Sequence, residues 1–503
     1  MTQTRRCPRH AVLVLVGVLL TGCATRLPID ERWIEVRTQN FSITSAMSEA
    51  RTVELARSLE VFRSGVLRLT NVESPDAPVP TRIYLFDSAG SFGPFSPDPT
   101  IVGYFMPTVR ANFVAIAQVP QVDTSRILKH EYVHFLVRSG SPRVHPHWYE
   151  EGFAELLSTM NVESEHLVVG GIPEDRIREL EFSSWLPLHR IMHYDGSQRW
   201  QPVEVAMFYA QSWALVHYLT RDQERRVAIT KAMSVYVELL QNGTSQPRAS
   251  ESAFGKTTSE LDGSLRDYLR KGSFSPFGVP LKRIEWPKAT EVSDLSRAEA
   301  AVRLGELALL AGKVLMARTL FEAALVEEPD NARAHAGLGG VLAAAELWEE
   351  ARPHLETAVE IAPDDPLNEL DLGAYWQARA AGTEEAELRR KMLIDARRHY
   401  ERSADLDDGR PEPFARYGES FLVEGEDPSR GIKTLEHAVR LLPSAVEVRL
   451  SLAEAYVGAG REEDARPLLR RILAWAHDEE MADRARELLE SLDGDGDTRA
   501  GPE

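Results

Sequence analysis

The 503-residue chain has few cysteines, because Cys7 and Cys23 are the only two. They permit at most one intramolecular disulfide and exclude a Cys-rich zinc finger. The chain also lacks an excess of basic residues: 58 Lys and Arg stand against 77 Asp and Glu, and the net charge is −19. Binding to nucleic-acid phosphates needs a basic face, so we expect no nucleic-acid partner.

Long apolar runs are scarce as well. The run from Ala11 to Leu20 is far shorter than the roughly 20 residues that cross a bilayer, which argues against a polytopic membrane protein. Apolar residues still make up 43% of the chain and charged residues 27%, as in ordinary globular proteins, so wholesale disorder is excluded. The length predicts roughly three domain-sized units.

The N-terminus has the features of an export signal. Residues 1–10 carry three arginines and no acid, the short apolar run follows, and small residues precede Cys23. This order predicts a secretory signal peptide over residues 1–22. An ordinary cleaved signal with an incidental cysteine is one alternative.

The sequence Leu20-Thr21-Gly22-Cys23 resembles a bacterial lipobox. In such signals the cysteine is lipidated and becomes the first residue of the mature protein, so the resemblance implies a lipid anchor on Cys23. Residue 24 is Ala and not Asp. By resemblance to Gram-negative lipoprotein sorting, this implies a bacterial envelope protein on the outer membrane, facing the periplasm.

The first half of the chain predicts an α+β domain over residues 23–270. Alternating apolar residues predict strands, and apolar residues at helical spacing predict helices. The expected strands are Arg32–Ser45 (a strand or hairpin), Thr81–Phe86 and Ala111–Ala117, and the expected helices are Met47–Leu69, Ser125–Arg138 and His147–Met160, with more helices through about Leu269. Residues 91–107 are rich in Gly and Pro and predict a loop. Residues 271–294 contain three prolines and predict a linker with few contacts.

The second half, residues 295–492, predicts an all-α solenoid of about five tetratricopeptide repeats with a capping helix. Small and apolar residues recur 34 positions apart, which is the period of this repeat. The pairs are Leu304 and Leu338, Gly305 and Gly339, Ala317 and Ala351, Phe321 and Leu355, Ala324 and Ala358, and Pro329 and Pro363. Residues 493–503 alternate Asp with Gly and predict a disordered acidic tail.

One short motif in the first half indicates metal chemistry. His130-Glu131-Tyr132-Val133-His134 is an H-E-x-x-H sequence on a predicted helix. Residues i and i+4 share one helix face, so both imidazoles can bind one Zn²⁺. Glu131 then lies on a neighbouring face, where it can act as a general base. A pair of surface histidines on an amphipathic helix is the alternative.

A catalytic zinc needs a third protein ligand, and the second predicted helix offers candidates. Its sequence Trp148-Tyr149-Glu150-Glu151-Gly152-Phe153-Ala154 resembles the third-ligand helix of the gluzincin peptidases. The resemblance implies that Glu151 is the ligand and that Glu155, one turn later, orients a ligand histidine. Glu150, His145 and His147 remain alternative ligands. A metzincin arrangement fails, because residues 137 and 140 are Val and Gly.

Together, these features resemble the peptidase-MA-like domain of bacterial lipoproteins. The resemblance implies a downstream donor for the oxyanion, and Tyr209 is the candidate, with His217 and Tyr218 as alternatives. It also implies that the strand at Ala111–Ala117 lies at a sheet edge and pairs with the substrate backbone. The aminopeptidase signature G-x-M-E-N is missing where Arg110-Ala111-Asn112-Phe113 stands, which favours an endopeptidase.

The predicted function is therefore a lipid-anchored zinc metallopeptidase. Its expected cofactor is Zn²⁺, its substrate is a protein or peptide, and the repeat groove is expected to bind a protein partner. A repeat scaffold with a non-catalytic peptidase-like domain is one alternative. A zinc hydrolase that acts on non-peptide envelope material is another.

Overall fold

The computed structural model describes residues 28–70, 72, 79–99, 101–119, 124–140, 145–163, 165–194, 200–242, 244–272, 274–283, 290–475 and 479–498. The predicted signal peptide, residues 1–22, and the predicted lipidation site Cys23 lie outside these residues. Among the helices that are described, none is long and apolar enough to cross a membrane.

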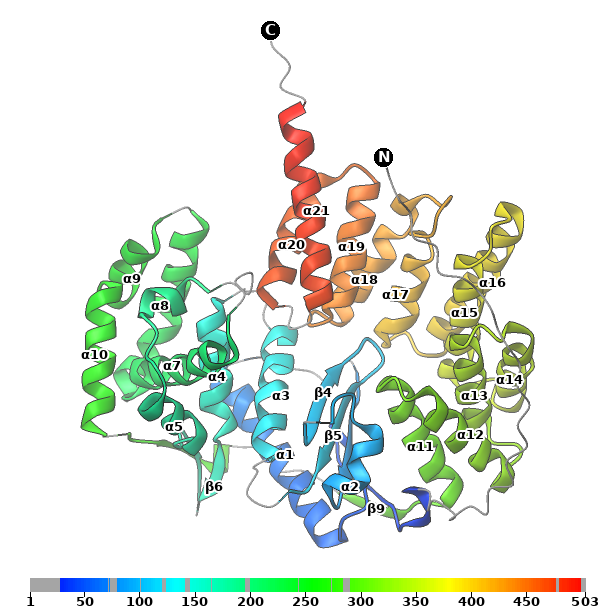
Figure 1. The fold of residues 1–503 in the computed structure, drawn as a ribbon, viewed down its shortest axis with the longest axis horizontal. Helices are drawn as coiled ribbons and strands as arrows, with labels where there is room; N and C mark the ends of the chain where they lie inside the picture. The colour runs from blue at the N-terminus through cyan, green and yellow to red at the C-terminus, as the bar shows by residue number, and fades with distance from the viewer. Residues whose placement is uncertain are drawn as a thin grey trace.

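A six-stranded sheet lies at the centre of the molecule (Figure 1). Its strand order is β4 (Gly103–Pro107), β5 (Asn112–Ala117), β3 (Thr81–Phe86), β2 (Phe41–Ser45), β1 (Ile34–Arg37) and β9 (Glu291–Asp294). Strands β2, β3 and β5 are parallel, and the other pairings are antiparallel. The α+β prediction for this half is confirmed, and β1 and β2 form the predicted hairpin.

The prediction that Ala111–Ala117 forms the sheet edge is wrong. Strand β5 pairs with both β4 and β3, so it is internal. The edge strand is β4, which lies inside the predicted loop 91–107 and packs against α3 (Thr124–Gly140). The Gly- and Pro-rich composition before β4 produces only the short helix α2 (Ala89–Phe92) and the 3₁₀ turn Gly93–Phe95.

Both faces of the central strands β3 and β5 are buried. Ile83, Leu85 and Val114 belong to one apolar cluster with residues of α1 (Glu49–Thr70) and α3. Tyr84 and Phe113 point to the opposite face and belong to a second cluster, which they share with the repeat helices between residues 297 and 381. The chain therefore forms three layers, with α1 and α3 on one side of the sheet and the repeats on the other (Figure 1).

A group of helices extends the α3 side of the molecule (Figure 1). These are α4 (His147–Ser158), α5 (Glu174–Phe182), α6 (Leu188–Met192), α7 (Pro202–Thr220), α8 (Gln223–Gln241), α9 (Gln246–Phe254) and α10 (Thr258–Lys271). A small antiparallel sheet of β6 (Asn161–Glu163), β7 (His166–Val169) and β8 (Phe277–Pro280) accompanies them.

The predicted linker, residues 271–294, is not a free connection. Its first part contains β8, which pairs with β7, and a 3₁₀ turn at Leu281–Arg283. Its last part is β9, which completes the central sheet by pairing with β1. Prolines at the ends of such short strands do not prevent pairing at an edge, and that is where both strands lie.

The repeat array begins directly after β9. Its helix pairs are α11 (Arg297–Leu310) with α12 (Val314–Glu327), α13 (Ala332–Ala344) with α14 (Trp348–Ile361), α15 (Pro366–Ala381) with α16 (Ala386–Leu406), α17 (Pro411–Glu419) with α18 (Ile432–Leu441), and α19 (Val446–Gly458) with α20 (Glu462–Trp475). The predicted solenoid is confirmed. The recurring glycines have a packing reason, because a Cβ on Gly305 or Gly339 would lie 2.8 or 2.6 Å from the partner helix side chain.

The final helix, α21 (Glu479–Thr498), is longer than predicted. Residues 493–498, expected to be part of a disordered tail, continue it. Arg466 on α20 stabilises this extension, because it pairs with the Asp493 carboxylate and donates to the Leu492 carbonyl. Residues 499–503 lie outside the described part of the chain.

Candidate metal centre

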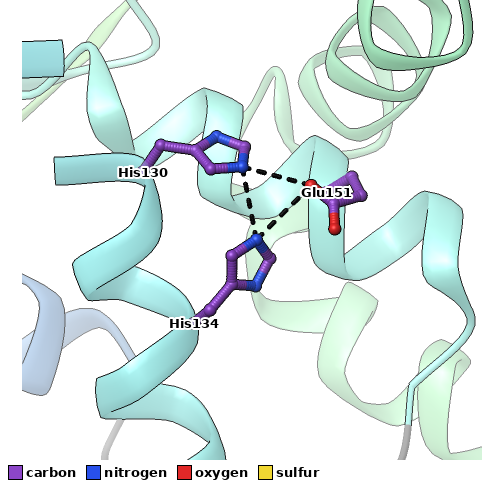
Figure 2. Close-up of side chains that lie close together, drawn as sticks. All are labelled: His130, His134 and Glu151. Atoms are coloured by element: carbon purple, nitrogen blue, oxygen red, sulfur yellow. Dashed lines mark hydrogen bonds and ion pairs between the residues drawn. The ribbon is translucent and has the colours of Figure 1, made fainter. Parts of the chain in front are cut away.

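The two histidines of the H-E-x-x-H motif lie one turn apart on α3. Leu128, Val133 and Leu136 bury the other side of this helix in the apolar core, so both imidazoles are directed away from the sheet. His134 is buried and His130 is partly buried. Their Nε2 atoms lie 3.3 Å apart, and both rings point toward α4 (Figure 2).

Helix α4 brings Glu151 to these imidazoles. The Glu151 carboxylate is 1% exposed, and its Oε2 lies 3.1 Å from His130 Nε2 and 3.4 Å from His134 Nε2. The next residue, Gly152, fixes the position of α4, because a Cβ there would lie 2.2 Å from the Ser212 carbonyl oxygen on α7. The Glu-Gly pair of the motif thus combines a buried carboxylate with a close helix crossing.

The three side chains fit a zinc ion. Zinc bonds of about 2.0–2.1 Å in tetrahedral geometry place the ligand atoms roughly 3.3 Å from one another. The observed separations are 3.1, 3.3 and 3.4 Å. Among the residues that the structure describes, this is the one group of three His, Cys, Asp or Glu side chains that could hold a metal ion.

Glu155 lies one turn beyond Glu151 and faces the other nitrogen of His130. Its Oε1 is 3.5 Å from His130 Nδ1. Two arginines hold the buried carboxylate: Arg126 donates to it at 2.8 Å and Arg176 at 2.6 Å. Burial alone lowers the pKa of His130, but the hydrogen bond and charge of Glu151, and then the charges of Glu155 and Glu131, raise it above its usual value.

The alternative third ligands take other positions. The Glu150 carboxylate bonds the Arg138 guanidinium at 3.0 Å. His147 Nδ1 lies 3.8 Å from Glu151 Oε1, and its ring stacks on Tyr194 with centroids 5.5 Å apart. His145 lies against the Tyr149 ring. None of the three joins the group of ligand atoms described above.

Tyr209 on α7 lies beside the cluster. Its ring centroid is 6.1 Å from that of His130, and the Arg176 guanidinium lies 5.3 Å from its centre. The charge of Glu151 and then burial raise the pKa of Tyr209, so the hydroxyl keeps its proton and can donate a hydrogen bond. The alternatives lie elsewhere: His217 bonds the Gly170 carbonyl and the Tyr268 hydroxyl, and Tyr218 packs on Tyr268.

A cavity of about 350 Å³ opens next to the cluster. Glu131 and His134 form part of its wall, so the motif glutamate faces the space from which a substrate would reach the two histidines. Edge strand β4 forms a second wall through Phe105, Met106 and Pro107. The chain thus brings a candidate base, one of the three candidate ligands and an edge strand to one cavity.

The sequence patterns did not predict the arginines that pair with the buried glutamates of α4. Glu150, Glu151 and Glu155 are all buried, and a buried carboxylate generally needs a cationic partner. Three acids in an otherwise apolar helix were a signal that such partners exist. Their identities depend on tertiary packing, because Arg126 lies on α3, before the motif, and Arg176 lies on α5.

The second half of the chain is similar to known proteins. A tetratricopeptide repeat family model matches residues 308–367 and 422–492. This part of the chain is a tetratricopeptide repeat array. Repeats of this kind stack into extended concave surfaces that serve for binding partners. No curated protein matches the chain.

Several solved repeat proteins are similar to the chain. TTC0263 of Thermus thermophilus is 24% identical over 38% of this chain and 98% of its own, with a TM-score of 0.35. PilF of Pseudomonas aeruginosa is 18% identical over 39% and 86%, with a TM-score of 0.32. YrrB, a repeat protein with an unusual peptide-binding site, is 17% identical over 38% and 92%, with a TM-score of 0.28. Because these TM-scores are low, the assignment of the repeats depends on the family match and on the 34-residue spacing.

Proposed function

We propose that the chain is a zinc-dependent peptidase. The observation that carries this proposal is the geometry of His130, His134 and Glu151, whose three ligand atoms are spaced as the corners of a zinc tetrahedron. Glu151 at this position agrees with the gluzincin-like motif, and three ligands leave one coordination position open for chemistry.

A zinc ion held by these ligands would polarise a carbonyl and make water more acidic. The chain's own residues would do the rest. Glu131, on the cavity wall beside His134, would accept the proton of the attacking water and deliver it to the leaving amine. Tyr209, beside His130, would donate a hydrogen bond to the developing oxyanion. Glu155 would hold the His130 ring so that Nε2 faces the metal position.

The substitution Glu131→Gln tests this proposal. Glutamine has nearly the same shape as glutamate, so zinc content and fold should stay unchanged. It cannot accept the proton of the attacking water, so the general base is lost. Cleavage of a denatured protein substrate should fall by about 10²–10⁴-fold. Equal cleavage by the zinc-loaded variant and the wild type would reject the role of Glu131. Mass spectrometry of the digest identifies the bonds that are cut.

A scaffold function is the second candidate, and the comparisons support it more than the first. A family model matches the repeats, and repeats of this kind form concave surfaces that bind partners. In a non-catalytic domain, a protonated His130 paired with Glu151 would account for the same short distances. Full rescue of a deletion phenotype by zinc-loaded Glu131→Gln protein would favour the scaffold over the peptidase.

We also propose that the protein is lipid-anchored in the bacterial envelope, on the outer membrane and facing the periplasm. The support is the L-T-G-C sequence that ends at Cys23, followed by Ala24. Cys23→Ser should abolish incorporation of a fatty-acyl label. A variant that still takes up the label would contradict the anchor.

A further inference from the structure

The concave face of the repeat array contacts the chain's own sheet. Arg82 on β3 pairs with Glu306 on α11 at 2.8 Å. Arg110, in the turn between β4 and β5, pairs with Asp371 on α15 at 2.7 Å and with Glu412 on α17 at 2.8 Å. These partners lie on the first helices of the first, third and fourth repeats. The inner helices of the array therefore contact β3 and the β4–β5 turn.

This contact is extensive and specific. The charges of Asp371 and Glu412 outweigh burial and raise the pKa of Arg110 well above its usual value. Next to Arg110, the Val109 N–H donates to Glu447 Oε1 on α19 at 2.9 Å. Four of the five repeats thus bond the sheet or its turn directly. We conclude that the array is built onto the first half of the chain and is not a separate module.

The last repeats extend this contact to the candidate metal centre. The cavity next to His134 has Leu442, Ala445 and Val446 in its wall, from the junction of α18 and α19, together with Met481 on α21. The Ser139 hydroxyl on α3 bonds the Ser444 hydroxyl at 3.0 Å, which holds this junction against the helix that carries the motif. The site therefore lacks one wall without the repeats.

The lining of the cavity favours an apolar occupant. Its area is mostly contributed by apolar side chains from β4, α3 and the repeats. Two charged groups in the wall already have partners, since Arg138 bonds Glu150 and Glu447 accepts from Val109, and the third, Glu131, is the candidate base. The volume of about 350 Å³ is near the lower limit for small-molecule pockets, which are roughly 300–1,000 Å³, and suits one large side chain.

The edge strand β4 indicates the kind of molecule that carries this apolar side chain. Strand β4 ends the central sheet, and its outer side pairs with no other strand among the described residues. An extended peptide can add to such an edge through main-chain hydrogen bonds, and alternate side chains then enter the flanking pockets. A folded domain would not fit a cleft bounded by the sheet, α3 and the last repeats.

We propose that the repeat array forms the specificity pocket of the site. The occupant is an extended polypeptide that lies along β4 and inserts one large apolar side chain between Phe135 of α3 and Val446 of α19. This inference rests on the proposed function in one respect: the peptide is a substrate only if the chain is a peptidase. Its structural content, a repeat-built pocket for an apolar side chain, can be measured without catalysis.

The test compares Val446→Trp with Val326→Trp, both made in the Glu131→Gln protein so that bound peptide is not cut. Tryptophan at position 446 should fill the pocket. Val326 on α12 is the control, because it is 81% exposed and does not line the cavity. The probes are two fluorescein-labelled ten-residue Ser/Thr peptides with a central Phe or Ala. Their dissociation constants are measured by fluorescence anisotropy.

The parent protein and Val326→Trp should bind the Phe peptide at least about tenfold more tightly than the Ala peptide. Val446→Trp should lose this preference while keeping its zinc. If Val446→Trp does not fold, Met481→Trp fills the same cavity from α21. Equal affinity of the parent for both peptides, or a preference that survives the filling substitution, would overturn the inference. A parent that selects the Phe peptide but holds no zinc would reject the proposed function alone.

Discussion

Neighbouring glutamates in α4 have different partners, and this difference defines the candidate site. Glu151 faces two imidazoles, Glu150 faces Arg138, and Glu155 faces Arg126 and Arg176. The helical period predicts that Glu151 and Glu155 share a face and that Glu150 does not. The resemblance to the gluzincin helix, in which the glutamate before glycine is the ligand, ranked Glu151 above Glu150. It could not show which arginines neutralise the remaining carboxylates.

Substitution of Glu155 tests its orienting role. Glu155→Gln removes the charge that faces His130 Nδ1 at 3.5 Å but keeps the size of the side chain. Substitution of the group behind a ligand histidine typically weakens metal binding by about 10–100-fold. Zinc affinity is measured by competition with a chelator. Glu163→Gln, on an exposed strand, is the control, and the prediction fails if both variants bind zinc equally.

At the scale of elements, the crossing of α4 and α7 places both Glu151 and Tyr209. Gly152 permits this crossing, because its Cα faces the Ser212 carbonyl. Gly152→Ala should force the helices apart and lower the free energy of unfolding by about 1–3 kcal/mol. Urea denaturation measures the change.

Gly340 provides the matched control for that prediction. It also lies within a helix, α13, but an added Cβ would meet no atom within 4 Å. Gly340→Ala should be neutral or stabilising by up to about 1 kcal/mol, because alanine has the higher helix propensity. A Gly152→Ala protein as stable as Gly340→Ala would show that the close crossing is not required.

Individual elements were more predictable than their order in the sheet. The β3 segment and the motif helices have local patterns that define them, and the structure forms them almost as predicted. The edge position of β4 and the pairing of β9 with β1 depend on contacts between distant segments. One local signal pointed to the true position of β5: its residues are apolar on both faces, which is typical of a strand that is covered on both sides.

At the scale of the whole molecule, the two halves share a core. Tyr84, Phe86 and Phe113 of the sheet belong to one apolar cluster with the repeat helices. Independent domains were the simpler expectation from the sequence, because the repeat period and the prolines of residues 271–294 suggest separate units. Periodicity describes how repeats pack on one another. It does not reveal a second surface that the array covers.

Truncation after Asp294 tests this shared core. The shortened protein retains β9 but exposes the sheet face that the repeats cover. An apolar patch of this kind promotes aggregation, so we expect low solubility or strong binding of a hydrophobic dye. A soluble monomer with the zinc affinity of the full chain would show that the first half folds without the repeats.

The most direct test of the account is the zinc content of the purified full-length protein. Elemental analysis should find about one zinc per chain. His130→Ala and His134→Ala should each abolish binding, and Glu151→Ala should weaken it severely, because each removes one of three ligand atoms spaced 3.1 to 3.4 Å apart. Glu150→Ala should keep its zinc, since that carboxylate faces Arg138. Wild-type protein that contains no zinc and takes up none on addition would contradict the metal centre.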